Sequence, residues 1–307
     1  MIFIKKLLLL CFLFVFTFVS TFVFAQQNET IPITMGITGN IPTSSIFFAI
    51  DGEEDTGLIN LQPNQTTILS CWGVADDLDG LDDLVSLHSV IYSSSQTRFS
   101  PANQSNVYIN NSCDTDTWNV NGFWNCTYAV RYYAEPSEWT CIINITNVDS
   151  EFYNDTINTT AVVEELVAIS LDTGTIDFGL RAVGLNYSAD TLVLVYNQGN
   201  VPLDLLVDAF DTGSTYVDDS DLAFNCTIGN IPVSYLRFSL QEEEDYLNSI
   251  PMVATGSASI SLDLQPQFYG SGSFLPTFAN TFWAPAIPMN IAGTCTGRIM
   301  YIAQVNN

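Results

Sequence analysis

Five carboxylates crowd into eight residues in the run DDLDGLDD at positions 76–83. Charges of one sign held this close repel one another unless a cation lies among them. Calcium takes six to eight oxygen ligands, and Asp77, Asp79 and Asp82 are its candidate ligands here. The run is not an EF-hand, because the twelfth residue from Asp77 is His88 and not a glutamate. A solvated acidic turn between two strands is the alternative, and the sequence leaves both interpretations open.

His88 is the single histidine of the chain, so it cannot supply both a metal ligand and a general base. It alternates with Leu87, Ser89 and Ile91 in an apolar run, which favours a position on a strand face over a place in a Ser-His-Asp set. A hydrolase on a β scaffold is therefore the weakest alternative. We expect a protein that is not an enzyme and that has no cofactor beyond calcium.

Aromatic side chains provide a second candidate chemistry, because their rings can stack on sugars. A platform on one sheet face would make the protein a carbohydrate-binding accessory protein. The competing interpretation is that the same rings cap the core. The residues concerned are Trp118, Phe123, Trp124 and Trp283.

The charge balance excludes several functions. The 307 residues include 33 Asp and Glu against 7 Lys and Arg, a formal net charge of -26. A nucleic-acid partner requires a basic face, and none can be built from this composition. Both lysines, Lys5 and Lys6, lie in an apolar N-terminal leader. Once the leader is removed, 33 acids and 5 arginines leave a charge of -28, and no lysine remains for a Schiff base.

The leader, residues 1–25, has the layout of a secretory signal peptide. Its two lysines precede an apolar run, and the small residues Val23 and Ala25 suit cleavage before Gln26. The alternative is an uncleaved anchor, since the run is just long enough to span a membrane. The prediction is an extracellular or cell-surface protein that meets the membrane only through this leader.

Cysteines and glycosylation sequons agree with export. Beyond Cys11 in the leader, six cysteines remain, an even number typical of disulfides. Closure within each half predicts the pairs Cys71–Cys141, Cys113–Cys126 and Cys226–Cys295, with Cys71–Cys126 as the alternative. The Asn-x-Ser/Thr acceptors are Asn28, Asn64, Asn103, Asn110, Asn125, Asn144, Asn154, Asn158, Asn186 and Asn225.

Short apolar stretches between Gly, Pro, Asn and Asp turns predict an all-β chain, with two tandem antiparallel β-sandwiches. In residues 123–134, Trp124, Cys126 and Tyr128 share one face and Asn125 the other. The polar stretch 151–162 is the predicted linker between a domain at 26–150 and one at 163–307. Predicted strands include 31–37 and 174–179, and residues 265–292 are predicted to be a long loop with at most one strand.

Several short motifs resemble known modules. The runs C-W-G-V-A-D-D-L-D-G-L-D-D-L (71–84) and V-R-Y-Y-A-E-P-S-E-W-T-C (130–141) resemble the immunoglobulin-like and PKD-like modules of secreted archaeal and bacterial surface proteins. The second half is similar to prokaryotic Ig-like modules, on the motifs I-D-F-G (176–179) and T-L-V-L-V-Y-N-Q-G-N-V-P-L-D (191–204). This resemblance implies Ig-like sandwiches in a surface-layer, filament or adhesion protein. Its implied partners are other surface proteins or glycans, or further copies of itself.

Overall fold

The computed structural model describes twelve stretches of the chain, and the descriptions below concern those stretches alone. They are residues 43–44, 47–50, 53–54, 57–77, 80–97, 99–114, 122–147, 152–154, 159–213, 221–253, 258–267 and 277–306. Several sequence predictions fall outside them: the leader 1–25, the strand 31–37, Asn28, Asp79, Trp118 and Asn158.

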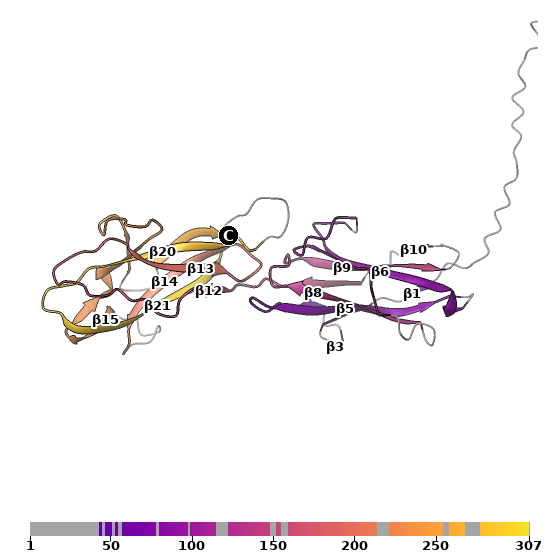
Figure 1. Ribbon diagram of the computed structural model, residues 1–307, viewed down its shortest axis with the longest axis horizontal. Helices are drawn as coiled ribbons and strands as arrows, with labels where there is room; N and C mark the ends of the chain where they lie inside the picture. Colours follow the sequence, from indigo (N-terminus) through magenta and orange to yellow (C-terminus); the bar gives the residue numbers. More distant parts are fainter. Residues whose placement is uncertain are drawn as a thin grey trace, which may run out of the picture. The chain divides into compact units, whose positions relative to one another are not determined.

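The chain is all-β, as predicted, and the first half forms two sheets. One sheet holds β1 (Thr43–Ser44), β2 (Phe47–Ile50), β3 (Glu53–Glu54), β5 (Thr66–Asp76) and β8 (Phe123–Arg131). The other holds β4 (Leu58–Ile59), β6 (Leu84–Ser93), β7 (Val107–Asn110), β9 (Glu138–Asn147), β10 (Phe152–Asn154) and β11 (Thr159–Val163). Figure 1 shows β5 and β8 in one layer and β6 and β9 in the other.

The second half also forms two sheets. The first holds β12 (Ile169–Leu171), β13 (Thr191–Asn197), β17 (Leu236–Ser239), β18 (Ile250–Pro251) and β20 (Phe278–Pro285). The second holds β14 (Leu203–Asp211), β15 (Leu222–Ile228), β16 (Asn230–Pro232), β19 (Ala258–Leu264) and β21 (Ala292–Val305). Every strand pairing of the described residues joins two strands of the same half.

The strict alternation of buried and less buried side chains explains how the central strands pack, with one face of each strand toward the core. In β8, the side chains of Trp124, Cys126 and Val130 are fully buried, and Asn125 on the opposite face is half-buried. Successive strand residues point to opposite faces, so an apolar residue at every second position seals one face of the sheet. The predicted facing of this strand is thus confirmed.

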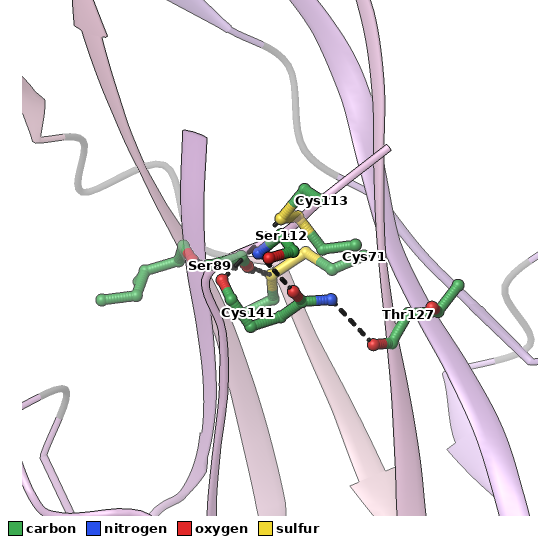
Figure 2. Close-up of a disulfide and its surroundings, with 9 residues drawn as sticks. Cys71, Ser89, Ser112, Cys113, Thr127 and Cys141 are labelled. Atoms are coloured by element: carbon green, nitrogen blue, oxygen red, sulfur yellow. Dashed lines mark hydrogen bonds between the residues drawn. A yellow bond between two sulfur atoms is a disulfide. The ribbon is translucent and has the colours of Figure 1, made fainter. Parts of the chain in front are cut away.

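Three disulfides are present, and they are the three pairs expected from the sequence. Cys71–Cys141 joins β5 to β9 and so links the two sheets of the first half, with a Cα–Cα distance of 6.5 Å. Cys113–Cys126 lies beside it (Figure 2), because Cys71 and Cys126 are cross-strand partners on β5 and β8. The third bond, Cys226–Cys295, joins the neighbouring strands β15 and β21.

Two sequence predictions about strands are wrong. The stretch 151–162, predicted to be a linker, contains β10 and most of β11, both of which pair with β9. The stretch resembled a linker because it is rich in Asn, Asp and Thr, although β11 lies between β9 and β4 and buries Ala161 and Val163. The stretch 174–179 was expected to be a strand but has no ladder partner among the described residues. The sheets also depart from a purely antiparallel pattern, since β11 pairs with β4 in parallel.

The two halves repeat one pairing scheme. In the first, β5 pairs with β8 and β6 with β9; in the second, β13 pairs with β20 and β14 with β21. Strand β21 therefore holds in the second half the position that β9 holds in the first. This equivalence allows the two sandwiches to be compared strand by strand.

Candidate functional site

The acidic run forms the turn between β5 and β6. The Gly80 N–H donates to the carbonyl of Asp77 over 3.1 Å, and a short 3-10 turn, Leu81–Asp83, leads into β6. The Asp77 side chain is buried, and that of Asp82 is exposed. Among the residues that the structure describes, no three Asp, Glu, His or Cys side chains are grouped closely enough to hold a metal, and Asp79 is not among those residues. The calcium site stays a prediction.

Calcium should raise the melting temperature of the protein if Asp77, Asp79 and Asp82 are its ligands. An ion that binds only the folded state stabilises it by about 2.7 kcal/mol at a hundredfold excess over its dissociation constant. Magnesium should do less, because it requires octahedral geometry and loses water reluctantly. Thermal melting with calcium, magnesium and sodium at matched ionic strength checks this, with Asp79→Asn as the variant. An unchanged calcium shift in the variant would leave a solvated turn.

The residues that the sequence suggested for catalysis and for stacking on sugars do not form one site. His88 is exposed on β6, opposite Asn144 of β9, so it is a strand-face residue as expected. Trp124 and Trp283 are fully buried and belong to the two cores. Phe123 is half-buried and stacks against Trp72, with ring centroids 6.0 Å apart.

The predicted glycosylation acceptors differ in exposure. Asn64, Asn186 and Asn225 are exposed, whereas Asn103, Asn110, Asn125 and Asn144 are half-buried; for Asn154 the structure describes the backbone only. The Asn103 carboxamide already accepts hydrogen bonds from the backbone N–H groups of Asn106 and Val107. The three exposed asparagines are therefore the best placed to carry sugar, and the use of any of them stays a prediction.

An open groove of about 810 Å³ lies in the second half, and no sequence motif pointed to it. Its lining includes the segment Thr173–Arg181 and, on β21, Ala292–Ile299 and Tyr301. The lining is largely apolar and includes Ile176, Phe178, Val193, Phe224, Ile299 and Tyr301. Several of these side chains pack on the edge of the second core while remaining half-exposed, so the core is not sealed at this place.

Strand β21 explains why the groove is open. It pairs with β15 over Ala292–Gly297 and with β14 over Gly297–Val305. Beyond Gly297, no strand among the described residues pairs with the edge that faces away from β14. In the segment Thr173–Arg181, the backbone of Ile176 and Asp177 makes no hydrogen bond to another described residue. The segment Ile176–Asp177 and three residues of the uncovered part of β21, Arg298, Ile299 and Tyr301, therefore line one groove.

The burial of the side chains of β21 also shows that this strand is incompletely covered. None of the fourteen residues of β21 is buried, although the strand lies in the middle of its sheet, whereas six of the nine residues of the neighbouring β14 are buried. The equivalent strand of the first half, β9, is covered by β10 and β11 on one side and by β6 on the other. Its inward residues Trp139, Cys141 and Ile145 are fully buried. The groove is thus a strand position that is filled in the first sandwich and open in the second.

Hydrogen bonds hold Tyr301 at the floor of the groove. The Trp283 Nε1–H donates to the Tyr301 hydroxyl over 2.8 Å, and Thr281 Oγ1 lies 2.9 Å from the same oxygen. The Thr281 hydroxyl donates to the carbonyl of Val193, so the Tyr301 O–H donates to Thr281. Burial raises the pKa of Tyr301 above its ordinary value, against the opposing effect of these hydrogen bonds.

Stability should fall as the pH rises above about 10. Burial raises the pKa of Tyr128 in the first core as well as that of Tyr301, so both phenols stay neutral in the folded state after they ionise in the unfolded chain. Above the unfolded pKa, the unfolded state binds fewer protons, which favours unfolding. Denaturant unfolding at about pH 8 and about pH 11 checks this. Tyr128→Phe should reduce the loss, and an equal loss in this variant would contradict the assignment.

Comparisons with known proteins add little to this geometry. No family model matches the chain, and no curated protein matches it. The chain is similar to a solved structure titled BspA_C_WT, with 11% identity, a TM-score of 0.23, and 86% of this chain and 96% of that chain covered. It is also similar to a structure titled "Chaperone-tip adhesin complex is vital for synergistic activation of CFA/I fimbriae biogenesis", with 10% identity, a TM-score of 0.28 and coverage of 86% and 84%.

A third similar structure is a Salmonella alpha-2-macroglobulin mutant, with 13% identity and a TM-score of 0.23. The match covers 88% of this chain but 15% of that one. TM-scores this low decide nothing about function. Among the described residues there is also no helix with the length and apolar character needed to cross a membrane.

Proposed function

We propose that the chain is an exported, non-enzymatic structural or adhesion protein of the cell surface, which binds another protein chain through the open strand position beside β21. The observation that carries this proposal is the pair of unused backbone edges along one apolar groove. An exposed strand edge is a template for an added strand, with main-chain hydrogen bonds for affinity and side-chain pockets for specificity. A groove of this kind suits protein binding better than chemistry on a small substrate.

Export is supported by independent features of the chain. Three disulfides persist in an oxidising compartment and are rare in the cytosol. The apolar leader and the sequons agree with the same compartment. The resemblance of both halves to Ig-like modules of prokaryotic surface proteins fits a role in a surface layer, filament or adhesive structure. The carbohydrate-binding alternative loses support, because Trp124 and Trp283 have no exposed surface for a sugar.

Surface exposure is tested on intact cells of the source organism. Mild protease treatment and gold-labelled antibody in electron microscopy should both reach the protein without lysis. An internal protein that is protected until lysis should serve as the control. Protection of this chain to the same degree as the internal control would overturn the proposed function.

A further inference from the structure

We propose that residues 31–37 of a second copy of this chain fill the open strand position beside β21, so that copies join head to tail. This inference rests on the proposed function and names the partner for the same groove. The occupant has the sequence IPITMGI and lies between the leader and β1. We call this segment the arm.

The first sandwich supplies the template for the missing strand. There, β11 lies between β9 and β4: Ala161 pairs antiparallel with Trp139, and Val162 pairs parallel with Leu58. In the second sandwich, β21 takes the place of β9, and the segment Thr175–Phe178 lines the same groove. A strand inserted between these two segments would give each a ladder partner and would cover the half-exposed side chains of the groove.

The arm has the pattern that such a position requires. Ile31, Ile33, Met35 and Ile37 occupy every second position, so one face of an extended arm is wholly apolar. The uncovered part of β21, Arg298–Val305, is eight residues long, one residue longer than the arm. Seven extended residues span about 23 Å. Pro32 lacks a backbone N–H, but it lies at the start of the arm, where a strand tolerates proline.

Charge favours this contact over others between two copies. The chain carries a net charge of -26, so most faces of two copies repel one another. The stretch 31–42 contains no Asp or Glu. Two of the five arginines beyond the leader, Arg181 and Arg298, line the groove together with Asp177, and Arg181 forms an ion pair with Asp190. The arm and the groove are thus among the least repulsive parts of the chain.

The contact joins two different surfaces, because the arm precedes the first sandwich and the groove belongs to the second. A contact between unlike surfaces does not close on itself in a dimer, and it propagates into an open chain of copies when the rotation between them does not close a ring. The expected product is a series of oligomers, with one unfilled groove and one unused arm at the ends of each.

Light scattering after size exclusion of the purified exported protein tests the proposal. The wild type should give a concentration-dependent series of oligomers, and Met35→Asp should give a monomer, because a carboxylate on the apolar face would be buried in the groove. Thr34→Asp is the matched control, since it adds the same charge to the opposite face, and it should assemble as the wild type does. Assembly of Met35→Asp like that of Thr34→Asp, or a wild type that is monomeric at all concentrations, would overturn the proposal.

Complementation identifies the two halves of the contact. Ile299→Asp has an intact arm and a damaged groove, whereas Met35→Asp has a damaged arm and an intact groove. In a mixture, only the arm of the first variant can bind the groove of the second, so the mixture should give a dimer and nothing larger. If Ile299→Asp does not fold, a labelled peptide of residues 29–39 replaces it and should bind to the Met35→Asp protein. The same peptide with Met35→Asp should bind at least about tenfold more weakly than one with Thr34→Asp. Equal binding by the two peptides would overturn the proposal, whereas surface exposure on cells would still stand.

Discussion

Replacing Cys71 and Cys141 together with alanine should lower the free energy of unfolding by about 4 kcal/mol. This disulfide closes a loop with a sequence separation of 70 and joins the two sheets of the first sandwich through β5 and β9. Its loss frees a long loop in the unfolded chain and removes two sulfur atoms from a fully buried part of the core. Guanidinium unfolding followed by tryptophan fluorescence measures the change.

The bond Cys113–Cys126 provides the matched control in the same sandwich. It closes a loop with a sequence separation of 13, so its removal should cost less, about 3 kcal/mol. Both variants leave two other disulfides in place. A loss for Cys71 and Cys141 no larger than that for Cys113 and Cys126 would contradict the role of the first bond as the link between the sheets.

Trp283→Ala should destabilise the second sandwich by about 4 kcal/mol. The indole is fully buried on β20, stacks near Phe238 with ring centroids 5.9 Å apart, and donates its N–H to Tyr301. Alanine leaves a large cavity and removes that hydrogen bond. Trp72→Ala, at a half-buried tryptophan of the first sandwich, should cost far less. Chemical denaturation of both variants checks this, and similar losses would contradict the core position of Trp283.

The sequence predicted best the features that depend on local patterns: which face of a strand is buried, and which cysteines pair within one half. In β8 and β9, every second residue is buried, and all of these buried residues except Asn147 are apolar. The disulfide pairs followed from closure within each half. Strands β10 and β11 were missed because the stretch around them is rich in Asn, Asp and Thr, which matches the pattern of a linker, although β11 buries Ala161 and Val163. Their place is set by backbone pairing with β9, which leaves little trace in side-chain type.

The groove could not be predicted from the sequence, for a related reason. The stretch 174–179 was expected to be a strand because it is a short apolar stretch between turn residues. The side chains of Ile176 and Phe178 do pack against the core, but the backbone there has no strand partner among the described residues. Whether an apolar stretch becomes a strand depends on the presence of a neighbour at hydrogen-bonding distance. Only the comparison of β21 with β9 shows that such a neighbour is missing.

The open strand position beside β21 is tested most directly by amide hydrogen exchange, followed residue by residue in the Met35→Asp variant. Alternate N–H groups of a strand point to opposite edges, so β21 carries an internal control. Within Ile299–Val305, the amides that point to β14 should be protected, and those that point into the groove should exchange rapidly. The amides of β9 should be protected at both edges. Equal protection along both edges of β21 would contradict an open strand position.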